Sequence, residues 1–360
     1  MPDIADIFRD NIASYPYPLS DVQRHAVHDI CTCRTPEMKY WARYSCPHCG
    51  ETHFAYPSCG NRNCPKCGQD KVEKFLDKQQ KNLLPVKYFM ITVTVPSEMH
   101  RICRKHPKEI FDAFFHAAAE SIRELARNKR HLGAEIGLIG TLQTWKRNGD
   151  YHPHIHFLVP GGGLSPDGRY WLYPHKRDFF IPAKPLSVLL RGKMYAAMRK
   201  LNFISEIPDS AWQKHWVSDC AEVGNGMSSF KYLAPYMQRG FISNARIVSC
   251  DGENVTFSFV ESSTKITRYR TLTAVEFIRL YLQHVLPSGF QKTRYYGLLG
   301  SANRKTIQEL RLLILSSRFS EPEEPLEEFK VKRPVCPKCK TLMFFSGMFS
   351  RPPPMLLRSG

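Results

Sequence analysis

Residues 151–159 carry three histidines at alternating positions, His152, His154 and His156, in the run Tyr-His-Pro-His-Ile-His-Phe-Leu-Val. Alternate side chains of a β-strand share one face, so a strand here lines up the three imidazoles and packs the apolar residues on the other side. Neutral imidazole is the commonest metal-binding side chain, and two on one strand face can hold one ion. The structural alternative is a half-buried strand with polar residues facing water. Three histidines in five positions favour a functional site.

Two kinds of enzyme fit this pattern. In a histidine-triad nucleotide hydrolase, the imidazoles act as acid, base and nucleophile at a phosphate. In a metal-dependent nuclease for single-stranded DNA, a His-hydrophobe-His pair holds the ion and a tyrosine attacks the phosphodiester. The other motifs of the chain must decide between them.

A candidate nucleophile for the second chemistry is the pair Tyr232 and Tyr236. On a helix, residues four apart project from one face. Lys231 and Arg239 flank the pair, and a nearby cation favours the phenolate form. A tyrosine that attacks a phosphodiester keeps the 5′ phosphate as a covalent ester and conserves the bond energy for rejoining. The alternative is ordinary packing, and Pro235 would bend such a helix.

A third metal ligand is available from the strand that precedes the histidines. Residues 136–145 read as a strand, and Asn148-Gly149 is a turn signal. In the resulting hairpin, Gln143 lies roughly opposite His154. Its carbonyl oxygen can complete a facial set of two imidazoles and one oxygen, which suits Mg or Mn. The alternative is a polar residue that pairs at a strand edge.

Cysteine spacing predicts a structural zinc site near the N-terminus. Cys46-Pro-His-Cys49 and Cys64-Pro-Lys-Cys67 are two CPxC turns separated by 14 residues. Each turn brings two thiolates onto one ion, so the two turns together are expected to complete one tetrahedral site. Without a secretory signal, such spacing is typical of metal binding in a reducing compartment.

Further cysteines lie around this zinc motif. Cys33 and Cys59, with Cys31, either bind a second ion together with His48 or His53 or are buried thiols. Near the C-terminus, Cys336-Pro-Lys-Cys339 has no second cysteine pair behind it. That isolated pair suggests a truncated or frameshifted C-terminal end.

The composition favours a nucleic-acid partner. The 360 residues include 51 Lys and Arg against 33 Asp and Glu, giving a net charge of +18, which suits a polyanion. Arg294 stands beside Tyr295-Tyr296, a mixture of basic and aromatic residues found where unpaired bases stack. No apolar run is long enough to span a membrane, so we expect a cytoplasmic, nucleoid-associated protein.

The periodicity of apolar residues predicts an α+β fold around the histidines. A strand at 87–95, a helix at 107–128, the strand at 136–145, a tight turn and the histidine strand form an antiparallel arrangement. Further helices are expected at 1–30, 71–84, 185–201, 212–216, 273–286 and 306–315, strands at 245–250, 255–260 and 266–270, and an acidic linker at 321–328.

Taken together, the cysteine module, the HPHIHFLV and KYLAPYMQRG motifs, Val285–Phe290 and Arg294-Tyr-Tyr-Gly297 resemble one family. It is the two-tyrosine rolling-circle transposases of bacterial insertion sequences, within the HUH endonuclease superfamily, and the resemblance runs from about residue 20 to residue 345. It implies that His154 and His156 bind Mg or Mn, that Tyr232 and Tyr236 are the nucleophiles, and that His152 is not required.

The resemblance also implies an architecture and a reaction. We expect a zinc-binding module that contacts DNA at 1–84, an HUH catalytic domain at 85–300 with an insertion at about 161–226, and a C-terminal helix, linker and CxxC tail at 301–360. The catalytic domain is expected to be an antiparallel sheet with flanking helices. The expected activity is cleavage of single-stranded transposon ends and transfer to target DNA through 5′-phosphotyrosine links, with Lys231, Arg239 and Arg294 on the DNA.

Three other functions remain open at this point. A plasmid rolling-circle replication initiator or relaxase shares the same chemistry. A histidine-triad hydrolase explains the histidines but leaves the zinc motif, the charge and the tyrosines without a role. A zinc-containing DNA-binding protein without enzymatic activity is the third.

Overall fold

The computed structural model describes residues 3–68, 72, 75–76, 83–176, 180–225, 228, 230–231, 234, 240–301, 303, 305–316 and 334–350. The chain forms two compact units, each assembled from separate segments. A composite unit contains residues 1–74, 238–285 and 328–360, and a sheet unit contains residues 75–237 and 286–327. These interleaved units differ from the three consecutive domains that the sequence suggested.

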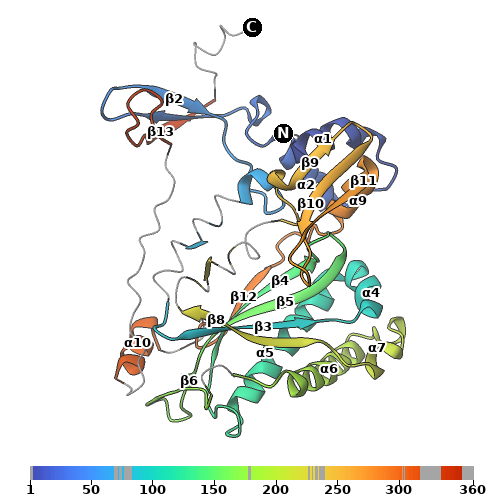
Figure 1. Cartoon of the computed structure of the whole chain (residues 1–360), viewed down its shortest axis with the longest axis vertical. Helices are drawn as coiled ribbons and strands as arrows, with labels where there is room; N and C mark the ends of the chain where they lie inside the picture. Colours follow the sequence, from blue (N-terminus) through green and yellow to red (C-terminus); the bar gives the residue numbers. More distant parts are fainter. Residues whose placement is uncertain are drawn as a thin grey trace. The chain divides into compact units, whose positions relative to one another are not determined.

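The sheet unit is built on a five-stranded antiparallel sheet with the strand order β12-β4-β5-β3-β8 (Figure 1). Its strands are β3 (Lys87–Thr94), β4 (Gly137–Trp145), β5 (Tyr151–Pro160), β8 (Ser218–Asn225) and β12 (Thr293–Gly297). β4 and β5 are joined through Asn148-Gly149, where Gly149 adopts a φ of +90° that favours glycine. The predicted hairpin and α+β class are confirmed.

Helices cover one face of this sheet. α5 (Pro107–Arg127) and α6 (Ala183–Lys200) lie on the same side of it in Figure 1. Ile91, Leu142 and Ile155 of the sheet share a continuous buried core with phenylalanines of α5 and with leucines and methionines of α6. Because side chains alternate along a strand, the neighbouring residues of β3, β4 and β5 point to the opposite face.

Residues 161–226, expected to be an insertion, contribute to this sheet and core. β8 pairs with β3 as an edge strand, and Leu186, Leu190 and Trp216 are buried in the core. The smaller elements of the unit are η3 (Ser97–Met99), α4 (His100–Lys105), β6 (Gly163–Leu164), β7 (Trp171–Leu172), η4 (Ile204–Glu206), α7 (Ser210–Gln213) and α10 (Ile307–Leu315). The helix expected at 212–216 corresponds to α7, which begins and ends a few residues earlier in the sequence.

The composite unit joins N-terminal helices to a second sheet. Its elements are α1 (Ile4–Asn11), η1 (Ile12–Ser14), α2 (Asp21–Thr32), η2 (Pro36–Met38), η5 (Asn244–Arg246), β9 (Ile247–Cys250), β10 (Asn254–Val260), β11 (Thr267–Thr273) and α9 (Ala274–Leu282). Phe8 of α1 packs edge-on against Tyr281 of α9 at 5.3 Å between ring centroids. Thr273 caps α9 with a capping box.

A small three-stranded sheet in the composite unit is named the ribbon here. It consists of β2 (Thr52–Ala55), β1 (Trp41–Ser45) and β13 (Phe344–Phe349), with β1 in the centre. β13 pairs with β1 from Trp41↔Phe349 to Ser45↔Phe344. The ribbon thus combines strands from near the two ends of the chain.

Two expected elements fall outside the described residues. These are most of the helix at 71–84 and the linker at 321–328. Among the described helices, none is long and apolar enough to cross a membrane.

Candidate metal centre and nuclease site

The three predicted ligands of the catalytic metal lie together on the face of the sheet opposite α5 and α6. In the β4–β5 pair Gln143 is directly opposite His154, and in the β3–β5 pair Thr92 is directly opposite His156. His154 and His156 have ring centroids 4.7 Å apart, and His152 is 5.3 Å from His154. The alternation in the sequence therefore places the imidazoles side by side, as predicted.

The strand that carries the histidines tolerates a proline because it bulges there. Pro153 has no backbone N–H to donate, and prolines inside sheets are confined to edges and bulges. The β4–β5 register shifts between the pairs Gln143↔His154 and Trp145↔Tyr151. From Tyr151 to His154 the β5 strand advances three residues while β4 advances only two. The bulge therefore ends at His154. Bulges of this kind re-aim side chains beside functional sites.

Hydrogen bonds fix which ring nitrogen of His154 can bind a metal. Its Nδ1 lies 2.7 Å from the carbonyl oxygen of His152, which can only accept. Nδ1 therefore carries the proton, and Nε2 carries the lone pair. For His156, Nδ1 lies 3.0 Å from the Thr92 hydroxyl. In metal sites a ligating imidazole commonly uses its second nitrogen in this way, which holds the ring orientation.

Gln143 offers an oxygen beside these imidazoles. Its Nε2 donates to the carbonyl of Trp145 at 2.9 Å, which fixes the orientation of the amide. Its Oε1 is buried, and none of the described residues donates a hydrogen bond to it. An unsatisfied buried acceptor costs about 1–3 kcal/mol. A cation bound there would satisfy it, so this amide and the two imidazoles fit a divalent metal.

The electrostatic setting keeps the imidazoles neutral. Burial lowers the pKa of His154 to about 3 and the pKa of His156 to about 4. Burial also lowers the pKa of His100, whose ring lies 6.1 Å from that of His152, to about 4. A metal ligand must present a lone pair, so neutral rings at pH 7 are the form that metal binding requires.

The predicted nucleophiles Tyr232 and Tyr236 and the predicted DNA contact Arg239 lie outside the described residues. Their neighbour Phe230 is buried and packs edge-on against Tyr88 at 5.8 Å between centroids. Tyr88 and Thr92 are four residues apart on β3, so they point to the same face of the sheet.

The other two predicted DNA contacts lie in the sheet unit. Lys231 is helical and exposed, as a DNA contact requires. Arg294 pairs with Asp112, and its guanidinium lies 4.4 Å from the ring centroid of Phe115 and 5.1 Å from that of Phe290. These contacts give Arg294 a structural role, and its contact with DNA stays a prediction.

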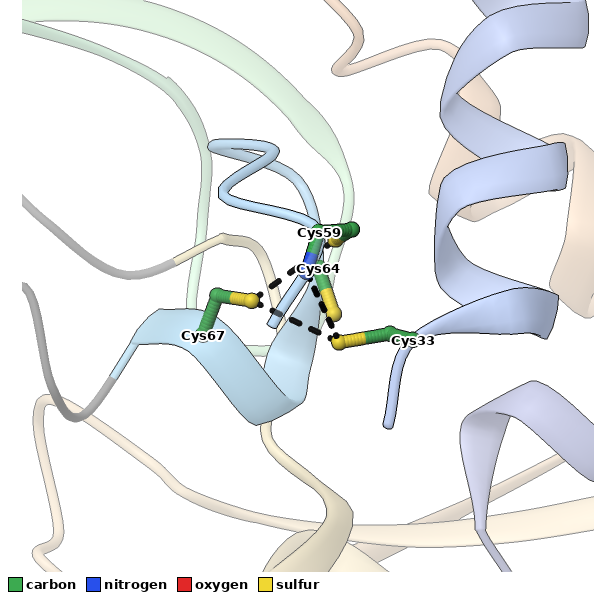
Figure 2. Close-up of side chains that lie close together, drawn as sticks. All are labelled: Cys33, Cys59, Cys64 and Cys67. Atoms are coloured by element: carbon green, nitrogen blue, oxygen red, sulfur yellow. Dashed lines mark hydrogen bonds between the residues drawn. The ribbon is translucent and has the colours of Figure 1, made fainter. Parts of the chain in front are cut away.

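A cluster of four thiols forms at the end of α2 (Figure 2). The sulfur atoms of Cys33, Cys59, Cys64 and Cys67 all lie within 4.8 Å of one another, with Cys33 to Cys67 at 3.5 Å. The backbone N–H groups of Cys59 and Asn61 donate to sulfur atoms of the cluster. Hydrogen bonds from the other three thiols hold the pKa of Cys67 below its ordinary value. The cluster has the ligand set of a structural zinc site.

The expectation that the two CPxC motifs share one ion is wrong. Cys64 and Cys67 join Cys33 and Cys59, whereas Cys46 and Cys49 lie in a second cluster with Cys336 and Cys339. The second pair that the C-terminal CxxC motif lacked in the sequence is thus Cys46 and Cys49. Cys31, His48 and His53 belong to neither cluster of the described residues.

Thr92 was not among the predicted site residues. A threonine inside a strand is ordinary because β-branched residues favour strands. The one available signal was its position on the strand expected to pair with the histidine strand.

Comparisons with known proteins identify the family of the chain. A family model described as "Putative transposase" matches residues 137–306, and one described as "Transposase zinc-binding domain" matches residues 4–95. A putative transposase of Sinorhizobium fredii, y4qJ, is 32% identical over 389 aligned positions that cover 98% of this chain and 97% of the relative. The chain belongs to the two-tyrosine transposase family of bacterial insertion sequences.

A second member of this transposase family is more distant. The transposase for insertion sequence element IS801 of Pseudomonas savastanoi pv. phaseolicola is 24% identical over 323 positions, covering 84% of this chain and 76% of the relative. No solved structure gives a significant match. The resemblance drawn from the motifs is therefore confirmed, and the zinc-binding domain model covers the cluster of Cys33, Cys59, Cys64 and Cys67.

Proposed function

We propose that this protein is a rolling-circle transposase that cleaves single-stranded DNA at the ends of its element and transfers it to a target in the cytoplasm. Gln143, His154 and His156 bind a catalytic Mg or Mn ion. Tyr232 and Tyr236 supply the attacking oxygens, and Lys231 and Arg239 contact the DNA backbone near them. Family membership and the net charge of +18 support this proposal.

The proposed reaction has two steps at phosphorus. In the first, the phenolic oxygen of Tyr232 or Tyr236 forms a bond to the phosphorus, and the bond from phosphorus to the 3′ oxygen breaks. The phenol proton passes to solvent, and the departing 3′ oxygen takes up a proton. In the second step, a 3′ hydroxyl of the target attacks the 5′-phosphotyrosine and releases the phenol. Each bond broken is replaced by one formed, so no external energy source is required.

The protein side chains hold the reacting phosphate in place. The bound ion would neutralise charge that builds up on the phosphate oxygens. Gln143 and His154 reach it from neighbouring strands, and the carbonyl of His152 fixes the tautomer of His154. Thr92 orients the ring of His156 from the third strand. The site thus rests on three hydrogen-bonded strands, which makes its geometry rigid.

The observation that carries the proposal is the buried Oε1 atom of Gln143. It lies in register with His154, and no described residue hydrogen-bonds to it. In a histidine-triad hydrolase the imidazoles act directly on phosphate, and this oxygen would have no role. In a metal-dependent nuclease it would serve as a metal ligand.

The test is a denaturing gel of the full-length protein incubated with Mn and single-stranded oligonucleotides from the ends of its own element. The comparison includes the wild type, Tyr232→Phe, Tyr236→Phe, His154→Ala and, as a matched control, His152→Gln, which keeps the backbone carbonyl. We expect a protein–DNA adduct that requires His154 and at least one tyrosine and survives in His152→Gln.

Three other outcomes would contradict parts of this proposal. Cleavage without an adduct would indicate hydrolysis and remove the tyrosine assignment. Binding without cleavage by a folded, metal-loaded protein would indicate a DNA-binding protein without nuclease activity. Cleavage and rejoining at a plasmid origin, without transfer to a second DNA, would indicate a replication initiator.

A further inference from the structure

The second thiol cluster joins residues from near the two ends of the chain. The sulfur atoms of Cys46, Cys49, Cys336 and Cys339 all lie within 4.8 Å of one another. Cys46 to Cys339 measures 3.4 Å and Cys49 to Cys336 measures 3.6 Å. Zinc–sulfur bonds of about 2.3 Å in a tetrahedron place sulfur atoms roughly 3.8 Å apart. A disulfide requires about 2.05 Å, and all four cysteines are free.

The two halves of this cluster have the same backbone geometry. In the first half, the backbone N–H of Cys46 donates to the carbonyl of Glu51 at 2.8 Å, and that of Gly50 donates to the carbonyl of Cys46 at 3.1 Å. In the second half, the backbone N–H of Cys336 donates to the carbonyl of Thr341 at 2.8 Å, and that of Lys340 donates to the carbonyl of Cys336 at 3.0 Å. Two segments far apart in sequence thus form matching turns, each presenting two thiols to the same point.

The turns share an unusual residue conformation. Gly50 has a φ of +71°, and Lys340, at the equivalent position, has a φ of +63°. Glycine adopts the left-handed region easily, whereas a lysine there is strained by about 1 kcal/mol or more. A bound ion that fixes the turn would compensate for this strain.

Few buried residues surround the second thiol cluster. Its core contains only Cys46, Cys336 and Met343 among the described residues, with Tyr44 and the two remaining cysteines packed against it. Modules this small rarely stay folded by burial alone and gain their stability from metal binding. The strand pair β1–β13 is the element that such an ion would stabilise.

We propose that Cys46, Cys49, Cys336 and Cys339 bind a second structural zinc ion, which fastens the C-terminal segment to the N-terminal zinc-binding domain. Cys336 and Cys339 lie outside both family models, which end at residues 95 and 306. Four thiolates in a tetrahedral arrangement favour zinc over hard cations such as Mg. The ion closes a loop of 287 residues between Cys49 and Cys336, which contains the whole sheet unit.

The first test counts zinc in the full-length protein, purified under reducing conditions, by elemental analysis. The wild type should contain two ions per chain. Cys336→Ser/Cys339→Ser and Cys46→Ser/Cys49→Ser should each contain one, and the quadruple variant should also contain one because all four residues hold the same ion. Cys339→His, which replaces one zinc ligand by another, should keep two, as should the control Cys250→Ser.

Two results of this count would overturn the proposal. One is an unchanged zinc content in Cys336→Ser/Cys339→Ser. The other is one ion in the wild type that is lost when Cys46 and Cys49 are replaced but kept when Cys336 and Cys339 are replaced. The ion remaining in each double variant reports that the Cys33 cluster is still folded.

The second test asks whether the ion fastens the C-terminal segment. A protease recognition sequence is inserted between Glu323 and Glu324, and the full-length protein is cut after purification. In the zinc-loaded protein the C-terminal fragment should co-elute with the remainder during size-exclusion chromatography. In the Cys336→Ser/Cys339→Ser variant it should separate. A fragment that separates from the zinc-loaded protein, or that stays bound in the variant, contradicts the fastening role.

Discussion

Gln143 lies directly opposite His154 in the antiparallel β4–β5 pair, with a buried amide oxygen that no described residue satisfies. The Nε2 group of the same amide donates to the carbonyl of Trp145. Because this bond fixes the amide, the side chain cannot flip to give the oxygen a hydrogen-bond donor. A buried acceptor without a donor lowers stability. Such a cost is typical of functional sites, where stability is given up for activity.

Replacing Gln143 by Leu should therefore separate stability from metal binding. We expect the free energy of unfolding of the metal-free protein to change by less than about 1 kcal/mol, because the loss of the bond to Trp145 offsets the removal of the unsatisfied oxygen. The affinity for Mn should fall at least about tenfold. Isothermal titration with Mn and urea unfolding measure the two quantities. A variant with unchanged Mn affinity would show that Gln143 is not a ligand.

Thr92 should act as a positioning residue through His156. Thr92→Val keeps the shape of the side chain but removes the hydroxyl 3.0 Å from Nδ1. Loss of such a partner typically lowers metal affinity or activity about 10–100-fold. The matched control is Thr94→Val on the same strand, whose hydroxyl donates to the carbonyl of Val217 instead. Thr92→Ser should restore binding, and equal effects of the two valine variants would contradict the role.

Removing zinc should change the reactivity of eight thiols together. In the zinc-loaded protein, maleimide should reach at most Cys31, Cys220 and Cys250, which are half-buried and lie outside both clusters. A strong chelator should expose the eight clustered thiols. Intact mass and peptide mapping give the count before and after chelation. Equal labelling of the Cys46 cluster in the two states would show that these thiols hold no metal.

The buried thiol of Cys103 should make the folded protein less stable in alkaline solution. Complete burial raises the pKa of its thiol from 9.0 to about 12. Between pH 9 and pH 12 the unfolded chain has released this proton while the folded chain keeps it. Stability therefore falls as pH rises, by about 1.4 kcal/mol per pH unit.

Urea unfolding at several pH values checks this dependence. Cys103→Ala should be less stable at pH 8 but should show a shallower decline above pH 9. Ile102→Val, in the same core, should also lose stability but should keep the slope of the wild type. If Cys103→Ala declines as steeply as the wild type, burial of this thiol is not the cause.

Arg294 should contribute to stability through its two rings and Asp112. Arg294→Ala removes the contacts with Phe115 and Phe290 and should lower the free energy of unfolding by about 1–2 kcal/mol. Asp112→Ala tests the ion pair alone and should leave affinity for single-stranded DNA unchanged. If Arg294 instead binds DNA, its alanine variant will lose DNA affinity at an unchanged melting temperature.

The parts of the structure that depend on local sequence were predictable. The alternation of His154 with Ile155 and His156 specified which side chains share a face, and Asn148-Gly149 specified the turn that sets Gln143 opposite His154. Both features arise within about a dozen residues, where strand periodicity and turn chemistry decide the outcome.

Elements that depend on distant partners were not predictable in the same way. β8 has the sequence Ser-Asp-Cys-Ala-Glu-Val-Gly-Asn and lies at the edge of the sheet, so no apolar alternation marks it as a strand. Closeness in sequence favoured a shared ion for the two CPxC motifs, because short loops cost less entropy to close. The structure instead joins Cys46 to Cys339, 293 positions away, through a strand pairing that no local pattern encodes.

The position of Cys336 and Cys339 has a consequence for the order of events during synthesis. A ribosome adds roughly 5–20 residues per second, so about 15–60 s separate the appearance of Cys49 from that of Cys336. The Cys33 cluster can close early, whereas Cys46 and Cys49 must wait until Cys336 and Cys339 have been synthesised. Zinc capture at that cluster would then report that translation has passed Cys339, which a nascent chain released before Cys336 could never do.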